Sequence, residues 1–329
     1  MQVVPFAETD SDEWDQVVAK AQAGTFIHTR RFLSYHRNRF DDCSVFVKND
    51  KQEVLGVLPA AIDPSNQVRV VSHPGITFGG LLHDGNLAGD IMIEAIECLR
   101  SYYLTLGMET VSYKAVPYIY HRRPASDDLY ALFRLNAVRT RCDLSSTIDL
   151  ANQGVLGSRR KRSLTKSRKA GVEVVRGADF ADELWEVITD NLERKLGEKP
   201  VHSVEEIKYL SSLFPENIKF IVGRLNGQTI AGITLFCSDS VVRAQYIASS
   251  PAGYEVSALD TIFEYAINEA RNHGRRYFDF GTSNRNEGRY LSQSLYQFKS
   301  EFGGGGVAHE YYDLGLTAQN ERVEDAVNL

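Results

Sequence analysis

One order of strand and helix patterns occurs twice in this chain of 329 residues, and it constrains the fold more than any other feature. A hairpin pattern over residues 43–62, whose returning strand is predicted at 54–62, reappears over residues 219–236. Apolar residues at helical spacing then follow each hairpin, at 89–106 and at 256–273. After each helix, a glycine leads into another short strand. The order predicts two copies of one α/β module.

We therefore expect an α/β chain, of the α+β type, with one domain at residues 1–150 and another at residues 151–329. Each domain should contain a mixed, mostly antiparallel sheet flanked by helices. The alternative is that two unrelated units resemble each other by chance. The shared order of five elements favours duplication.

Overall composition excludes several classes of protein. The net charge of -6 argues against DNA binding driven by bulk electrostatics. The N-terminus lacks a basic and apolar leader, and no apolar run approaches the ~20 residues of a membrane span. The cysteines are spaced far apart, which predicts reduced thiols, a cytoplasmic location and no metal site. They are Cys43, Cys98, Cys142 and Cys237.

The segment 158–169 is strongly basic within this acidic chain. Arg159 and Arg160 lead it, and they are candidate ligands for the phosphates of a carrier, an acceptor or RNA. The competing interpretation is a solvated helix face, which is what most runs of charge turn out to be.

The stretch 277–303 predicts a site. In a strand, Phe278 and Phe280 point to one side and Asp279 points to the other. Asp279 is a candidate proton acceptor, or else a cap for the loop that follows. Lys299 lies beside Phe298, and an ammonium among aromatic rings is suited to stabilise developing negative charge. The alternative for Lys299 is a surface lysine lying over an aromatic patch.

A predicted strand over residues 241–250 runs into a glycine-containing turn and a helix, an arrangement that can bind an anion. The predicted cofactor-binding residues are Ser250, Ala252, Gly253 and Tyr254, and Gln245 on the strand is a predicted substrate contact. His202 precedes the capping box predicted at Ser203, and it is a candidate base or an ordinary loop histidine.

Several segments together resemble a known family. They are Ser72-His73-Pro74-Gly75, Phe78-Gly79-Gly80-Leu81, Pro117-Tyr118-Ile119-Tyr120-His121, Pro200-Val201-His202-Ser203, Asp279-Phe280-Gly281 and the run from Tyr290 to Gly303. The chain is similar to bacterial tandem-GNAT acyltransferases related to the FemABX peptidyltransferases. The resemblance covers nearly the whole chain. It implies two packed GNAT folds with the active site mainly on the C-terminal copy.

The Phe298-Lys299 pair matches the family's Phe-Lys pair, which implies that Lys299 neutralises charge during transfer. The loops His73–Gly80 and Tyr118–His121 are predicted to line the acceptor pocket. The predicted substrate contacts are His73, Tyr118, Tyr120, His121, Tyr290 and Phe298. The turn at 250–255 departs from the usual GNAT motif for the coenzyme A pyrophosphate, Arg/Gln-x-x-Gly-x-Gly/Ala.

Three functions follow as hypotheses. The first is an N-acyltransferase that uses an acyl-CoA or a similar thioester as co-substrate, with no tightly bound cofactor, and an amine acceptor on a small molecule or a cell-envelope precursor. The second is a FemABX-like transferase that uses aminoacyl-tRNA. The third is a non-catalytic binding protein on a degenerate GNAT fold.

Overall fold

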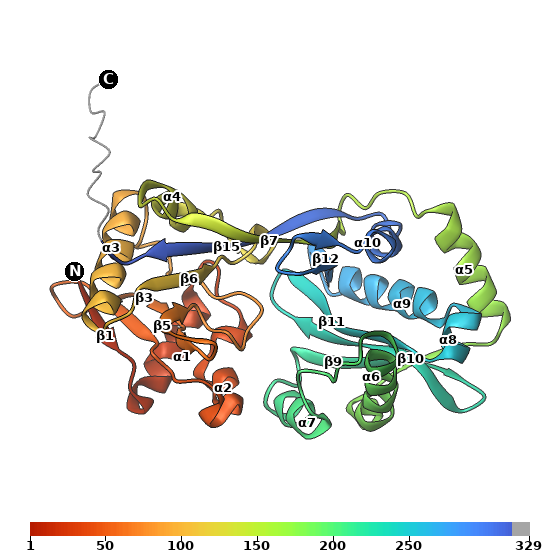
Figure 1. Ribbon diagram of the computed structural model, residues 1–329. Coiled ribbons are helices and arrows are strands. Elements are labelled where there is room, and N and C mark those ends of the chain that lie inside the picture. The colour runs from red at the N-terminus through yellow and green to blue at the C-terminus, as the bar shows by residue number, and fades with distance from the viewer. Residues whose placement is uncertain (318–329) are drawn as a thin grey trace. The chain divides into compact units, whose positions relative to one another are not determined.

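The computed structural model describes residues 1–317, apart from the side chain of Leu196, and the chain divides into two compact units (Figure 1). The N-terminal unit contains Met1–Cys142 and residues 309–317, and the C-terminal unit contains Asp143–Ala308. The unit boundaries fall inside strands β7 (Val138–Asp149) and β15 (Gly305–Gly315). The division into a domain at residues 1–150 and another at residues 151–329 stays a prediction.

The N-terminal unit contains two groups of strands. Antiparallel strands β1, β2 and β3 form a small sheet, and β4, β5, β6 and β15 pair in that order. Helix α3 (Asp90–Thr105) connects β5 to β6, which pair in parallel. The bounds are β1 Gln2–Pro5, β2 Val45–Lys48, β3 Val54–Leu58, β4 Ala61–Asp63, β5 Asn66–Val71, β6 Thr110–Lys114, α1 Ser11–Lys20, α2 Arg30–Leu33 and α4 Asp127–Arg134.

One strand prediction in this unit is wrong. The returning strand expected at 54–62 is two strands, β3 and β4, which belong to different sheets. Pro59 lies between them, and proline has no N–H to donate to a strand ladder. The chain therefore leaves one sheet at this residue and joins the next.

In the C-terminal unit the strand order is β7-β12-β11-β10-β9-β8, antiparallel except for the β11–β12 pair. Helix α9 (Ala258–Asn272) covers one face of this sheet, and α6 and α7 lie on the other (Figure 1). Both units thus have the predicted mixed sheet flanked by helices. The other bounds are β8 Glu173–Arg176, β9 Ile218–Leu225, β10 Gln228–Cys237, β11 Val241–Ser249, β12 Tyr277–Thr282, β13 Asn284–Arg285, β14 Tyr290–Leu291, α5 Ser158–Lys169, α6 Ala181–Leu196, α7 Val204–Leu213, α8 Pro251–Val256 and α10 Gln293–Ser300.

The helix predicted at 256–273 is interrupted at its start. Ser257 has a φ of 59°, in the left-handed region, and it separates the short helix α8 from α9. Ser250 caps α8 by accepting the N–H of Gly253, and Pro251 occupies the first helical position, where its missing N–H does no harm.

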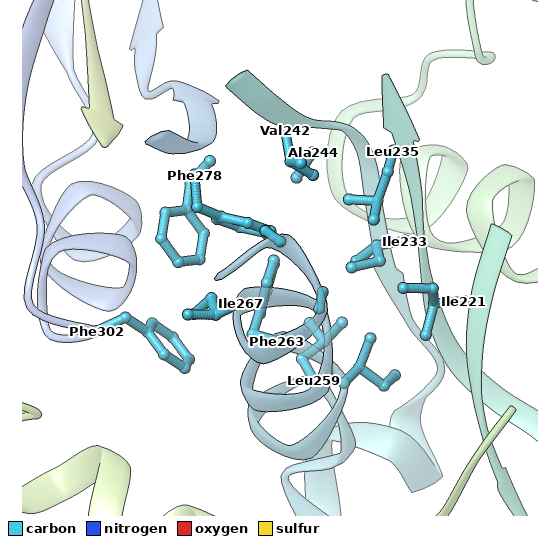
Figure 2. Packing of buried hydrophobic residues seen from close by; sticks show 14 of the residues in the cluster. Ile221, Ile233, Leu235, Val242, Ala244, Leu259, Phe263, Ile267, Phe278 and Phe302 are labelled. Carbon is cyan, nitrogen blue, oxygen red and sulfur yellow. The ribbon is translucent and has the colours of Figure 1, made fainter. Parts of the chain in front are cut away.

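Aromatic packing against α9 forms the centre of this unit (Figure 2). The ring of Phe263 lies 4.8 Å from that of Phe280 and 5.4 Å from that of Phe302, measured between ring centres. Phe278 is also fully buried here. The prediction that Phe278 and Phe280 share the core side of their strand is confirmed, and it leaves Asp279 on the opposite face.

Candidate active site

Strands β11 and β12 diverge inside the C-terminal unit. Their parallel register pairs Val241–Arg243 with Tyr277–Asp279 and ends there, although both strands continue. On its other side, β11 has a register shift against β10 that leaves Gln245 as the extra residue of a β-bulge. A bulge bends its strand and frees backbone polar groups from the ladder. The candidate site is therefore at this divergence.

Asp279 is completely buried at the point where the strands part. Its carboxylate accepts a charged hydrogen bond from Arg243 Nη1 at 2.8 Å, the N–H of Gly281 at 2.9 Å and the hydroxyl of Thr147 at 3.3 Å. The bond to Gly281 matches the loop-capping interpretation. A role as proton acceptor stays a prediction, and it would require Asp279 to weaken its ion pair.

Lys299 on α10 is 3% exposed. Its Nζ donates to the carbonyl oxygens of Gly281 at 2.9 Å and Thr282 at 2.8 Å. Burial lowers the pKa of Lys299 to about 7, while the charge of Asp279 raises it and that of Arg243 lowers it further. The φ of Gly281 is +75°, a conformation that favours glycine, so this loop is shaped to present its carbonyl to the lysine.

Arg243 connects the predicted residues, and the sequence analysis missed it. Besides its bond to Asp279, its Nε donates to Gln245 Oε1 at 3.3 Å. A signal was present, because Arg243 and Gln245 alternate within an otherwise apolar strand and so project from it two residues apart. Gln245, Asp279 and Lys299 are thus connected through Arg243 and the Gly281–Thr282 loop.

His202 lies in the loop before α7 and is 5% exposed. Its Nδ1 and the hydroxyl of Tyr246 are 2.5 Å apart, and its carbonyl accepts the indole N–H of Trp185 at 3.0 Å. Burial raises the pKa of Tyr246 to about 12. The predicted capping box at Ser203 is confirmed. Because Tyr246 follows Gln245 on β11, His202 is anchored to the same strand region.

The turn predicted to bind a cofactor pyrophosphate has few backbone donors to offer. Gly253 donates its N–H to Ser250 Oγ at 3.1 Å, Tyr254 donates to the carbonyl of Ser250 at 3.0 Å, and Pro251 has none. A Cβ on Gly253 would lie 2.4 Å from the carbonyl oxygen of Ile230. This glycine is therefore needed for packing. Of the first three residues of α8, only Ala252 has an N–H with no acceptor in the described part of the chain, so the turn as folded does not fit a pyrophosphate well.

The basic segment forms α5 and presents two faces. Arg159 pairs with Glu301 at 2.7 Å, and the buried Arg160 pairs with Asp260 and Glu301. Four exposed cations on α5 have no carboxylate within 4 Å among the residues that the structure describes. They are Lys161, Arg162, Lys166 and Lys169.

Four predicted substrate contacts lie in the N-terminal unit. The carbonyl of buried His73 accepts Lys114 Nζ at 3.1 Å, and Tyr120 packs on Phe78 with ring centres 4.4 Å apart. Tyr118 is exposed, and His121 Nε2 and the carbonyl oxygen of Val116 are 2.9 Å apart. The predicted part of these four residues in acceptor binding stays a prediction.

Two other predicted contacts lie in the C-terminal unit. Tyr290 is exposed on β14, and Phe298 packs against the core beside Lys299. Elsewhere in this unit, a cavity of about 950 Å³ is lined by the ends of β9, β10, α7 and α9, and none of the predicted site residues lines it. Across residues 1–317 there is no cluster of three or more metal-ligating side chains, and no helix there is long and apolar enough to cross a membrane.

Known proteins resemble this chain in sequence and in fold. Residues 158–299 match the acetyltransferase (GNAT) domain family. No curated protein sequence matches. Among solved structures, FemX has a TM-score of 0.66 at 11% identity, over 96% of this chain and 97% of FemX. The C-terminal domain of a putative lysylphosphatidylglycerol synthetase from Agrobacterium fabrum has a TM-score of 0.60 at 11% identity, over 93% and 92% of the two chains. A tandem GNAT protein from the clavulanic acid biosynthesis pathway has a TM-score of 0.52 at 10% identity, over 97% and 99%.

The family match begins at the first residue of α5 and ends at Lys299, so it spans strands β8 to β12 and the divergence between β11 and β12. At identities near 11%, the solved structures establish the fold. The non-catalytic interpretation is not supported. Residues 158–299 of the C-terminal unit are therefore similar to GNAT acetyltransferase domains, and the chain has a tandem-GNAT fold that resembles the fold of FemX.

Proposed function

We propose that this protein is an N-acyltransferase that moves an acyl group from a carrier thioester, such as an acyl-CoA, to an amine on a small molecule or a cell-envelope precursor. The observation that carries the proposal is the buried ammonium of Lys299. A lysine ammonium has three N–H bonds, and two of them go to Gly281 and Thr282. The third has no acceptor among the residues that the structure describes, and we propose that it binds a negatively charged oxygen of the substrate.

The acyl-transfer reaction determines which groups the site must supply. The nitrogen of a neutral amine attacks the acyl carbonyl carbon, the carbonyl oxygen becomes negatively charged, and the bond to the carrier sulfur then breaks. The amine loses a proton, and the leaving thiolate gains one. A buried cation stabilises the oxyanion more than an exposed cation does, because water does not screen it. We assign this role to Lys299, and Asp279 and His202 remain candidates for moving the proton.

A second donor, aminoacyl-tRNA, is supported by a specific observation. The turn at Ser250–Tyr254 has few free donors for a pyrophosphate, whereas α5 exposes four cations toward solvent. These exposed cations would attract a large polyanion such as tRNA, with an affinity that falls steeply as the salt concentration rises. FemX and the lysylphosphatidylglycerol synthetase domain, which share the fold, are consistent with an aminoacyl donor. The bacterial, cytoplasmic setting predicted from the sequence is part of the proposal.

A thermal-shift panel tests the donor. The purified protein is heated with CoA, acetyl-CoA, a long-chain acyl-CoA and deacylated tRNA. A ligand present at about a hundred times its dissociation constant adds roughly 2.7 kcal/mol to the free energy of unfolding. Stabilisation by an acyl-CoA supports the thioester donor. Stabilisation by tRNA alone, lost in an Arg162→Glu/Lys166→Glu variant, supports the second donor.

Turnover then tests the role of Lys299. With the donor that binds, amines are screened for loss of the acyl group from its carrier. Lys299→Met should keep donor binding and reduce kcat by at least about a hundredfold, the usual effect of removing an oxyanion donor. Lys20→Met, a change at an exposed lysine of α1, is the matched control. A Lys299→Met enzyme with unchanged kcat would remove this lysine from the mechanism.

A further inference from the structure

Helix α10, which carries Lys299, is too short to hold its position alone. It has eight residues, and its N-cap residue Ser292 makes no side-chain capping bond. Isolated helices of this length are unstable in water, so tertiary contacts must fix it. The structure supplies these contacts from α9, where Phe263 packs on Phe298, and from α5, at the end of α10 where Lys299 lies.

Arg160 is the residue of α5 that reaches both neighbouring helices. Its Nη1 donates to Asp260 of α9 at 2.7 Å, and its Nε donates to Glu301 at 3.1 Å, immediately after α10. Its guanidinium carbon lies 4.7 Å from the centre of the Phe298 ring. Phe298 and Glu301 flank Lys299 in the sequence. Arg160 therefore holds α10 on both sides of the lysine and ties it to α9.

Burial makes the ion pair between Arg160 and Asp260 stronger than the exposed ion pair between Arg159 and Glu301. The side chains of Arg160 and Asp260 are 8% and 4% exposed, whereas that of Arg159, which also pairs with Glu301, is 50% exposed. Exposed ion pairs contribute little, but removing one partner of a buried pair is strongly destabilising locally. The buried location, with two carboxylates already bound, does not favour the phosphate-binding role predicted for Arg160.

We propose that Arg160 is a positioning residue, which fixes helix α10 on α9 and so holds the Lys299 ammonium at the Gly281–Thr282 loop. The inference rests on the proposed function of Lys299 for its catalytic meaning. Its structural content, that Arg160 controls the exposure of Lys299, is independent of any substrate.

Competitive labelling of lysines with trace acetic anhydride at pH 8, read by mass spectrometry, tests this directly. Arg160→Met should raise the labelling rate of Lys299 at least about tenfold, the factor that corresponds to about 1.4 kcal/mol in a local opening equilibrium. Lys114, which is 8% exposed in the N-terminal unit, is the internal reference and should change by less than about twofold.

The matched control is Arg168→Met. Arg168 lies on the same helix and pairs with Glu264 of α9, and within residues 1–317 it makes no hydrogen bond or ion pair with α10. This variant should leave the labelling of Lys299 unchanged. A second test variant, Glu301→Gln, removes the charge that Arg160 contacts beside α10 and should raise Lys299 labelling by a smaller factor. If Arg160→Met does not fold, the labelling of Lys299 in Glu301→Gln tests the proposal instead.

Three results would overturn the proposal: unchanged labelling of Lys299 in Arg160→Met, an equal rise at Lys299 and Lys114, or an equal effect of Arg168→Met. Labelling uses neither acyl donor nor acceptor, so its outcome is separate from that of the turnover test. If Lys299→Met is inactive while Arg160→Met protects Lys299 as the original protein does, the catalytic proposal stands and the positioning proposal fails.

Discussion

Burial of the Lys299 ammonium predicts a defined pH dependence of stability. The pKa of this lysine falls from its ordinary 10.5 to about 7 in the folded protein. Between these values the unfolded chain binds a proton that the folded chain lacks. The free energy of unfolding therefore rises with pH across this window, and stability is lost as the pH falls from 10.5 toward 7. Replacing Lys299 by Met removes this contribution.

The magnitude follows from the two pKa values. Each pH unit over which the folded and unfolded states differ by one proton changes the free energy by about 1.4 kcal/mol. At pH 7 the folded lysine is half protonated, and by pH 9 it is neutral, while the unfolded lysine is still mostly charged. The stability of the original protein should thus increase by about 2 kcal/mol more than that of Lys299→Met between pH 7 and pH 9.

Urea unfolding followed by tryptophan fluorescence measures the free energy of unfolding of both proteins at each pH. The chain has two tryptophans, Trp14 in the N-terminal unit and Trp185 in the C-terminal unit. A Trp14→Phe background leaves Trp185 to report on the unit that contains Lys299. Other titrating groups are common to both proteins, so their contributions cancel in the difference. A difference that stays constant from pH 7 to pH 9 would refute the argument from burial.

Three other changes have expected outcomes in the same unfolding assay. Arg243→Met should destabilise the C-terminal unit by about 3–5 kcal/mol, because it removes the ion pair of fully buried Asp279, and adding Asp279→Asn should recover part of the loss. Gly253→Ala should lower the free energy of unfolding, since its Cβ would collide with the backbone of Ile230; an unchanged value would show that α8 moves without cost. Phe263→Ala should reduce stability by about 3–5 kcal/mol, and a loss below about 1 kcal/mol would mean that the core collapses around the gap.

The fold was largely predictable because its strongest signals are local. Periodicity alone located the hairpin of β9 and β10, the strand β12 and most of α9. The assignment of β3 and β4 to different sheets was not predicted, because strand partners are chosen by contacts between residues far apart in the sequence. Pro59 was the one local indication that the strand could not continue.

The site was predictable only in part, for the same reason. Asp279 and Lys299 stand out from their neighbours by residue type alone. The basic composition of its helix predicts that Arg160 is a phosphate ligand. Its partner Asp260 lies 100 residues away in the sequence, so the ion pair could not be predicted. A charge run shows how many cations a helix has. Which of them turn inward to meet a carboxylate depends on the tertiary structure.

A comparison of the two buried lysines supports the role proposed for Lys299 over one for Lys114. Lys114 and Lys299 each donate to two loop carbonyls, and burial lowers the pKa of each to about 7. The charge that acts on Lys114 is that of Arg141, which lowers the pKa further. The pKa of Lys299 is raised by the charge of Asp279 and lowered by the charge of Arg243, which is the smaller of the two effects. An oxyanion that forms near Lys299 would raise its pKa again, because an opposite charge favours the ammonium. A lysine that is half protonated at rest can therefore become fully charged as the acyl carbonyl is attacked, which is when the cation is needed.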